Sequence, residues 1–317
     1  MTIALTARFP ELARVPRLAL GAFPTPIEHL SSTGSRLWVK RDDKSAQPFG
    51  GNKIRALEFL LARVSPNEPI VTVGGAGSTH ALSTAVFGCR AGHRVLVGRW
   101  RQVMNDAASI VAESIEREAD AAPVFRNPVI AYGWALAHRL RGASWIPGGG
   151  TNPLGMLGHV SAGLELASQI SGGSPDTARC VVVPLGSGGT AAGIALGLHI
   201  AKMPVRVVAV RVVPTIVANK RRLFSLARRT GRLMQSFGAP PVPPLPHDSI
   251  EIVHGAYGGA YGQETDAGRR ASGRFREAVG IPLDATYSAK AFSVALDRAQ
   301  REPTLFWLTF DPRMLTR

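Results

Sequence analysis

Strands and helices alternate along most of the sequence, and three of the turns between them are rich in glycine. Residues 70–73 and 180–185 are apolar, mostly β-branched runs, and each is followed by a glycine turn and a helical pattern. Repeated β–α order predicts an α/β fold with mainly parallel sheets and helices on their faces. Ligands of such folds bind at the carboxyl ends of strands. A site is therefore expected at the glycine turns, which cover 74–80, 148–155 and 186–193.

Periodicity and turn residues predict the other elements in the same way. Residues 1–30 are expected to be rich in loops, and the proline-rich segment 239–246 to be an exposed connector. Strands are predicted at 37–40, 70–73, 94–98, 180–185, 205–213 and 305–309. Helices are predicted at 54–64, 81–91, 105–119, 129–141, 151–170, 194–202, 216–236 and 264–279.

The length of 317 residues suggests roughly two domains of about 150 residues each. No run reaches the ~18 apolar residues of a membrane span, and the N-terminus lacks the apolar region of a signal peptide. Cys89 and Cys180 lie in apolar stretches without metal-site spacing, so we expect two buried thiols in a reducing compartment and no metal. These features predict a cytoplasmic protein that does not enter a membrane.

The net charge of +15 raises the question of nucleic-acid binding. The arginines are scattered, and only residues 218–232 form a dense basic patch. Aromatic residues make up 7% of the chain, and no recognition motif accompanies them. We therefore expect no nucleic-acid partner, because solvated basic faces and attraction of an anionic cofactor or substrate account for the charge.

The turn at 186–193 has the features of a phosphate cradle. A buried strand leads into it, a helix leaves it, and its small residues leave several backbone N–H groups unshielded. It lacks the lysine of a nucleotide P-loop and the glycine spacing of a dinucleotide site. It therefore suits a phosphate monoester, although a tight turn of small residues is the simpler alternative. The proposed contacts are Gly186, Ser187, Gly188, Gly189 and Thr190.

Lys53 lies where the loop Gly50-Gly51-Asn52 becomes a helix. Backbone N–H groups and the positive end of the helix dipole are expected to lower its pKa and favour the free amine. A free lysine amine is what bond formation to a carbonyl cofactor requires. The alternative is an ordinary surface lysine at a helix start.

Two further clusters have both a structural and a functional interpretation. Ser78, Thr79 and His80 follow glycines at a helix start, where hydroxyl and N–H groups can bind a carboxylate. Ser78 would equally serve as a helix cap there, and an isolated histidine is more often packed than catalytic. For Asp42 and Asp43 we favour capping or pairing with Arg41 and Arg55.

Taken together, these motifs resemble the fold-type II, tryptophan synthase β-like pyridoxal-phosphate (PLP) enzymes. More narrowly, the chain is similar to the 1-aminocyclopropane-1-carboxylate (ACC) deaminase / D-cysteine desulfhydrase family. The resemblance extends from about residue 10 to 309. It is carried by PTPIE (24–28), VKRDD (39–43), FGGNKIRALEFLL (49–61), VGGAGSTHA (73–81), GGGTNPLGMLGHVSAGLEL (148–166), LGSGGTAAG (185–193), YGGAYGQET (257–265) and LDATYSAKA (283–291).

The resemblance implies two open, twisted, mainly parallel sheets flanked by helices. A large PLP-binding domain would comprise residues 1–53 and 161–317, and a small domain, 54–160, would be inserted in it. A homodimer is usual for the family. The implied PLP contacts are Lys53, which forms the internal aldimine, Asn52, Thr79, Ser288, Thr309 and the cradle 186–190. The implied substrate and catalytic residues are Ser78, Thr79, His80, Tyr261 and Tyr287.

The chain departs from the family pattern at several positions. Thr79 replaces the usual asparagine, and Ala56 replaces a second lysine. Tyr287-Ser288-Ala289-Lys290 stands where cyclopropane deaminases have Tyr-Glu-Gly-Lys, so the acid that protonates the pyridine nitrogen is missing. A hydroxyl from Ser288 or Thr309 would leave that nitrogen neutral, which argues against cyclopropane opening. The closing Gly-Gly of the family is Phe310-Asp311.

The resemblance therefore predicts a PLP-dependent lyase or deaminase that acts on a small amino acid. D-Cysteine desulfhydrase-like β-elimination, through an external aldimine and an aminoacrylate, would yield an α-keto acid and ammonia. Two alternatives stay open: a β-replacement synthase of specialised metabolism, and a non-catalytic homologue that binds PLP or an amino acid.

Overall fold

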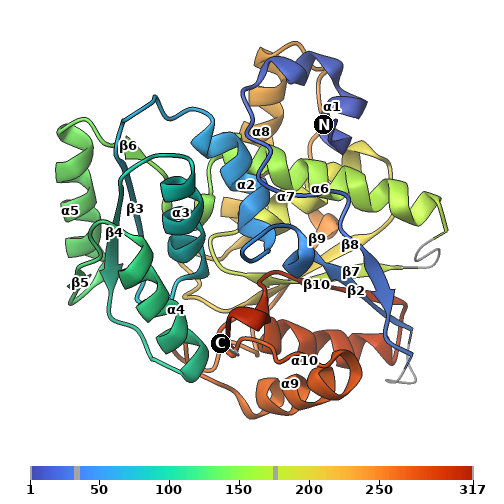
Figure 1. Ribbon diagram of the computed structural model, residues 1–317. Helices are drawn as coiled ribbons and strands as arrows, with labels where there is room; N and C mark the ends of the chain where they lie inside the picture. The colour runs from blue at the N-terminus through green and yellow to red at the C-terminus, as the bar shows by residue number, and fades with distance from the viewer. Residues whose placement is uncertain (1, 32–35, 174–177, 316–317) are drawn as a thin grey trace.

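The computed structural model describes residues 2–31, 36–173 and 178–315, which form two sheets with helices on both faces (Figure 1). The strand order is β1-β2-β10-β7-β8-β9 in the larger sheet and β5-β4-β3-β6 in the smaller one. The strands of the larger sheet are β1 (Ile27–His29), β2 (Leu37–Arg41), β7 (Cys180–Leu185), β8 (Arg206–Arg211), β9 (Ile250–Val253) and β10 (Thr304–Leu308). Those of the smaller sheet are β3 (Ile70–Gly75), β4 (Val95–Trp100), β5 (Val124–Phe125) and β6 (Ser144–Trp145).

All neighbouring strands are parallel except β1 and β2. This arrangement confirms the predicted α/β fold. The helices are α1 (Ala4–Arg8), α2 (Asn52–Leu61), α3 (Thr79–Arg90), α4 (Asp106–Glu118), α5 (Pro128–Leu140), α6 (Pro153–Ser171), α7 (Gly189–Ile200), α8 (Lys220–Ser236), α9 (Asp266–Val279) and α10 (Ser288–Ala299).

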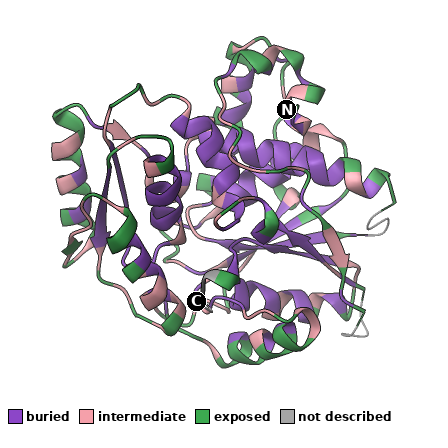
Figure 2. Cartoon of the chain, viewed as in Figure 1, coloured by how far each residue is buried: buried purple, intermediate pink, exposed green. Residues whose placement is uncertain are grey.

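Each sheet is buried between two helical layers. On the larger sheet, α6, α7 and α8 cover one face and α9 and α10 the other (Figure 1). On the smaller sheet, α5 covers one face, and α2, α3 and α4 the other. Strands β3 and β7 are buried along their whole length (Figure 2), which explains their continuous apolar sequences.

Side-chain caps set the starts of several helices. The Oδ1 atom of Asn219 accepts a hydrogen bond from the backbone N–H of Arg222 at 3.0 Å, so α8 begins at Lys220 and not at the predicted residue 216. Asn152 caps α6 in the same way, and Pro153 occupies its first position.

One further expectation was wrong, and two parts of the chain contain helices that were not predicted. The first 30 residues contain α1 and a 3₁₀ helix, Pro10–Arg14, whose Leu5 and Leu12 are buried in a hydrophobic cluster. Cys89 is partly exposed and not buried, whereas Cys180 is buried as expected. Helix α10, which packs against β7 and β10, was not predicted.

The predicted pairing of Asp42 and Asp43 is confirmed. The guanidinium of Arg55 binds Asp42 at 2.8 Å, and that of Arg41 binds Asp43 at 2.8 Å. Within the described ranges, no helix combines the length and apolar character needed to cross a membrane.

Candidate active site

A cavity of about 350 Å³ lies where the carboxyl ends of strands from both sheets face each other. Its volume falls within the range of small-molecule sites. The loops after β3, β7 and β10 all contribute to it, as expected for parallel sheets. Its lining includes most of the predicted site residues: Asn52, Lys53, Ser78, Thr79, His80, Gly186, Ser187, Gly188, Thr190, Tyr261, Tyr287 and Thr309. Gly189 and Ser288 are not part of the lining.

Lys53 is the second residue of α2, and its Nζ donates a hydrogen bond to the carbonyl oxygen of Gly149 at 3.2 Å. Burial lowers the pKa of Lys53 from 10.5 to about 8. The direction of the shift agrees with the sequence argument, and its cause is desolvation by burial. At a given pH, the fraction of Lys53 present as the free amine is therefore larger than that of an exposed lysine.

The loop before Lys53 is held against the end of β10. The backbone N–H of Asn52 donates to the carbonyl oxygen of Thr309 at 3.0 Å. Gly51 has a φ of +144°, and a Cβ there would lie 2.7 Å from the same oxygen. Glycine is therefore required at this close approach, which places Lys53 and Thr309 on neighbouring walls of the cavity.

The glycine turn after β7 forms a rigid cradle at the start of α7. Gly188 has a φ of +96°, and a Cβ there would lie 2.5 Å from Leu223. The hydroxyls of Thr151 and Ser187 are 2.6 Å apart, and Asn52 Nδ2 donates to Thr190 Oγ1 at 2.7 Å. Because the first N–H groups of a helix have no intrahelical partner, this cradle has the donor chemistry for a phosphate.

The donor set around the cavity fits PLP in outline. The cradle suits its phosphate, Lys53 its aldehyde, and a hydroxyl its ring nitrogen. Thr309 lines the cavity and can supply that hydroxyl. Ser288 is fully buried at the start of α10, and its Oγ has no hydrogen-bond partner in the described part of the chain.

Ser78 caps α3, as one of its two interpretations predicted. Its Oγ accepts a hydrogen bond from the backbone N–H of Ala81 at 3.3 Å. A Cβ on Gly74 would lie 2.7 Å from this oxygen, and one on Gly75 would lie 2.6 Å from the ring of Tyr261. The glycines thus allow Ser78 and Tyr261 to approach the same wall.

His80 is buried, and its Nε2 forms a hydrogen bond with Thr72 Oγ1 at 3.0 Å. Burial, and to a lesser extent the charge of Lys53, lowers the pKa of His80 to about 3. The ring is therefore neutral at physiological pH and poorly suited to act as a cation toward a carboxylate. Its packed position matches the structural interpretation.

Tyr261 and Tyr287 form a hydrogen-bonded pair of hydroxyls with rings at 71°. Burial raises the pKa of Tyr261 to about 12 and moves that of Tyr287 well above its ordinary value. Both phenols therefore keep their protons at neutral pH. The carboxylate of Asp284 fixes this end of α10 by accepting hydrogen bonds from the N–H groups of Tyr287 and Ser288 at 2.7 and 3.0 Å.

Several lining residues were not predicted. They include Trp100 at the end of β4, Tyr132 on α5 and Arg222 on α8. Trp100 follows a predicted strand, so the rule that sites form at carboxyl ends would have selected it. Tyr132 and Arg222 lie inside or near the start of helices far away in sequence, where no local signal marks them.

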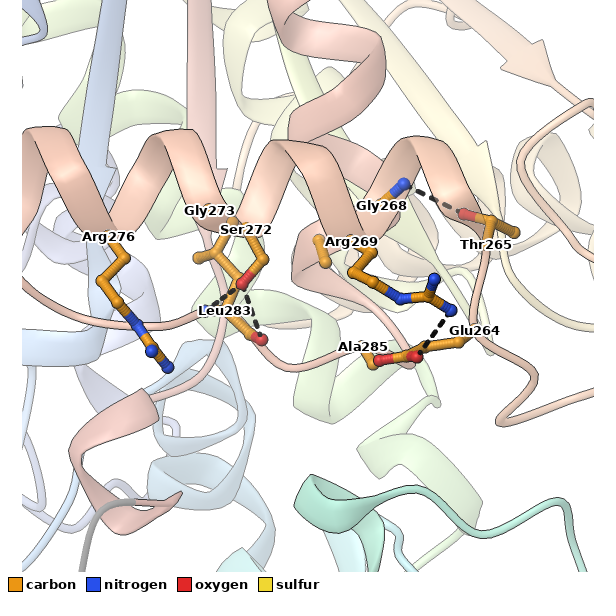
Figure 3. A pocket seen from close by; sticks show the side chains of 10 residues that line it. Glu264, Thr265, Gly268, Arg269, Ser272, Gly273, Arg276, Leu283 and Ala285 are labelled. Atoms are coloured by element: carbon orange, nitrogen blue, oxygen red, sulfur yellow. Dashed lines mark hydrogen bonds and ion pairs between the residues drawn. The ribbon is translucent and has the colours of Figure 1, made fainter.

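A separate hollow of about 270 Å³ lies beside α9 (Figure 3). Two of its polar side chains are engaged within it: Arg269 pairs with Glu264 at 3.4 Å, and Ser272 accepts a hydrogen bond from the N–H of Leu283 at 3.1 Å. None of the predicted site residues lines this hollow, so the cavity around Lys53 is the better candidate.

Comparison with known proteins identifies the family. Residues 18–305 match the family model described as "Pyridoxal-phosphate dependent enzyme". The chain is 34% identical to a nocardicin C-9' epimerase of Nocardia uniformis subsp. tsuyamanensis, over 95% of this chain and 94% of that protein. It is 29% identical to a D-cysteine desulfhydrase of Salmonella choleraesuis (strain SC-B67), over 90% and 89% of the two chains.

A solved structure of an ACC deaminase homologue superposes with a TM-score of 0.79 at 27% identity, covering 98% of this chain and 95% of that one. The processed form of threonine deaminase isoform 2 from Solanum lycopersicum superposes with a TM-score of 0.62 at 15% identity, covering 96% and 88% of the two chains, which supports the fold alone. The family match and these relatives agree on the family and the fold. The chain belongs to the pyridoxal-phosphate dependent enzymes of fold type II, among the relatives of the ACC deaminases and D-cysteine desulfhydrases.

Proposed function

We propose that this protein is a PLP-dependent lyase that eliminates a β-substituent from an amino acid, yielding an α-keto acid and ammonia. The observation that carries the proposal is a desolvated lysine, Lys53, that lines the same cavity as the glycine cradle. D-Cysteine desulfhydrase activity in a relative at 29% identity supports the reaction class.

In this proposal the bound cofactor supplies an electron sink for the bond electrons at the substrate α-carbon. Residues 186–190 and Asn52 would hold its phosphate, and Thr309 would supply a hydroxyl to its ring nitrogen. Ser288 is a second proposed hydroxyl for the ring nitrogen, but it is fully buried and does not line the cavity. A hydroxyl cannot protonate the ring as a carboxylic acid can, so the site favours reactions with a departing β-substituent.

Side chains of the protein carry out the proton transfers and bind the substrate carboxylate. Lys53, as a neutral amine, takes the α-proton. Ser78 and Thr79 bind the substrate carboxylate at the start of α3, where the helix dipole favours an anion. Tyr261 and Tyr287 stay protonated and can donate to the departing group, because burial raises the pKa of both phenols.

The first experiment compares the purified protein with Lys53→Ala. We expect wild type to develop a new visible absorbance band with PLP, and borohydride reduction to attach a pyridoxyl group to Lys53. D-Cysteine should then release sulfide and pyruvate. A protein that binds PLP through Lys53 but converts no amino acid would support the non-catalytic binding homologue instead.

A second candidate function is epimerisation at the α-carbon, favoured by the 34% identity to a nocardicin C-9' epimerase. Lys53 and the Tyr261–Tyr287 pair are two proton carriers in one cavity, which inversion requires. In deuterated water an epimerase inverts the amino acid and labels its α-carbon without forming keto acid. An eliminating enzyme forms keto acid, and a β-replacement enzyme consumes added nucleophiles.

We also propose that residues 54–160 form a small domain inserted in the large one made by 1–53 and 161–317. The strands of the smaller sheet all fall within 54–160, which supports this division. A cytoplasmic homodimer remains a proposal from the family resemblance, and sedimentation of the purified protein tests the oligomeric state.

A further inference from the structure

The solvent-facing half of the cavity around Lys53 is built from large apolar side chains. Trp100, Pro128 and Tyr132 approach from the smaller sheet and α5, and Val213, Pro214 and Val217 from the segment after β8. These residues are partly or largely exposed, and Tyr132 retains 46% of its accessible surface. Asn52, Ser78, Thr190 and Thr309 are buried, whereas Lys53, Thr79, Tyr261 and Tyr287 are partly exposed, like Trp100.

A substrate as small as cysteine fills only the inner part of such a site. With its carboxylate at Ser78 and its side chain at the tyrosine pair, it would leave the outer aromatic surface in water. Apolar surface lining the mouth of a cavity is usually covered by ligand, because burial of that surface is favourable. Trp100 and Tyr132 are held in a stack, with ring centroids 6.2 Å apart and 21° between planes.

The same mouth contains a cation that has no acidic partner among the described residues. Arg222 lies in the first turn of α8 and lines the cavity, and its Nε donates only a long hydrogen bond, 3.4 Å, to the carbonyl oxygen of Ser187. The hydroxyl of Tyr132 belongs to the same lining and forms no hydrogen bond within the described ranges. A guanidinium and a phenol at one rim are suited to a carboxylate or phosphate.

We propose that the substrate is an amino acid whose bulky, apolar or aromatic side chain extends between Trp100 and Val217 and ends in an anionic group at Arg222. This inference rests on the proposed function, because it assumes that Lys53 takes the α-proton of an amino acid. The cofactor phosphate is a second anion within reach of Arg222, since Ser187 belongs to the cradle. The experiment must therefore distinguish binding of the substrate's anionic group by Arg222 from binding of the cofactor phosphate.

The test measures α-proton exchange in deuterated water by NMR with the PLP-loaded enzyme, a readout that elimination and epimerisation share. The probes are alanine, phenylalanine, 4-carboxyphenylalanine and 4-aminomethylphenylalanine, each as both enantiomers, and calorimetry gives their affinities. We expect 4-carboxyphenylalanine to bind about tenfold more tightly than phenylalanine, from one charge-assisted hydrogen bond. Alanine and the cationic analogue should bind more weakly than phenylalanine.

Arg222→Gln should remove the preference for the carboxylate and leave the affinity for phenylalanine unchanged. Arg228→Gln is the matched control, because this arginine lies on the same helix but does not line the cavity. If Arg222→Gln instead lowers PLP affinity and leaves the discrimination intact, the cofactor phosphate is the anion and the inference is wrong.

The remaining outcomes separate the two proposals. Exchange of the α-proton of alanine without any response to the aromatic probes would overturn the inference and leave the proposed chemistry standing. Aromatic probes that bind with the expected preference but exchange no proton would support the inference about recognition and overturn the proposed chemistry. Failure to bind PLP would overturn both.

Discussion

At the scale of single residues, Lys53 provides a direct test of electrostatics. Burial lowers its pKa to about 8, so its amine loses the proton as pH rises through that value. We expect the rate of covalent attachment of PLP to rise from pH 6 to 8 and then to level off. With Nα-acetyl-lysine the rise should continue toward about pH 10.4. Stopped-flow absorbance measures both profiles, and a protein profile that parallels that of Nα-acetyl-lysine would refute the lowered pKa of Lys53.

Gly188 tests whether the cradle requires its backbone shape. Alanine in the left-handed region costs roughly 1–2 kcal/mol at any position, and at Gly188 its Cβ would also lie 2.5 Å from Leu223. Gly92 is the control, because its φ of +87° is similar and a Cβ there would meet nothing within 4 Å. We expect Gly92→Ala to lose about 1–2 kcal/mol of unfolding free energy with unchanged PLP affinity.

Gly188→Ala should lose more stability than Gly92→Ala and bind PLP at least about tenfold more weakly, since the cradle must shift. Urea denaturation and PLP titration measure the two effects. Equal effects of both substitutions on PLP affinity would show that the cradle is not the phosphate site.

At the scale of elements, the sequence predicted what local pattern encodes. The run Cys180–Leu185 is a strand with the bounds expected, because a fully buried parallel strand needs a continuous apolar sequence. Helix α10 was not predicted, although Phe292, Leu296 and Ala299 recur in it at helical spacing. Strands β5 and β6, of two residues each, are defined by their neighbours and have no local signature.

The site residues also fall into those that a local motif predicts and those that only tertiary packing brings together. Lys53 and the cradle stand in local motifs and were predicted, and the cavity brings them together. Arg222 and Tyr132 enter the cavity from helices α8 and α5, and only the packing of the two sheets makes them neighbours. Tertiary contacts of this kind cannot be derived from the pattern of one sequence.

A buried ionic cluster anchors α2, the helix of Lys53. Its Asp42–Arg55 pair was predicted, but the part that Glu165 and Lys40 contribute was not. Arg55 binds Asp42 and Glu165 at 2.8 and 2.9 Å, and Glu165 also binds Lys40. We expect Glu165→Gln to reduce the unfolding free energy by about 3–5 kcal/mol, because two buried cations lose their shared carboxylate. Glu264→Gln, which breaks an exposed pair with Arg269, should cost less than about 1 kcal/mol. Denaturant unfolding compares them, and equal losses would show that the cluster is not important for stability.

At the scale of the whole molecule, the cavity lies between elements that belong to different sheets. Its walls come from β3 and α3 on one side and from β7, α7 and β10 on the other. A ligand that contacts both sides and binds only the folded protein stabilises the whole fold against unfolding. Saturation with PLP at a hundred times its Kd should therefore raise the unfolding free energy by about 2.7 kcal/mol.

Hydrogen exchange can show whether that stabilisation reaches both sheets. We expect PLP to slow exchange in the loop 74–80 as well as in 186–190, because Thr79 of one loop and Thr190 of the other line the same cavity. In Lys53→Ala the non-covalent contacts remain, so protection of 186–190 should persist at high PLP while that of α2 weakens. Protection confined to 186–190 in wild type would mean that the cofactor stabilises the larger sheet alone. The smaller sheet would then join the site only when a substrate carboxylate binds at Ser78.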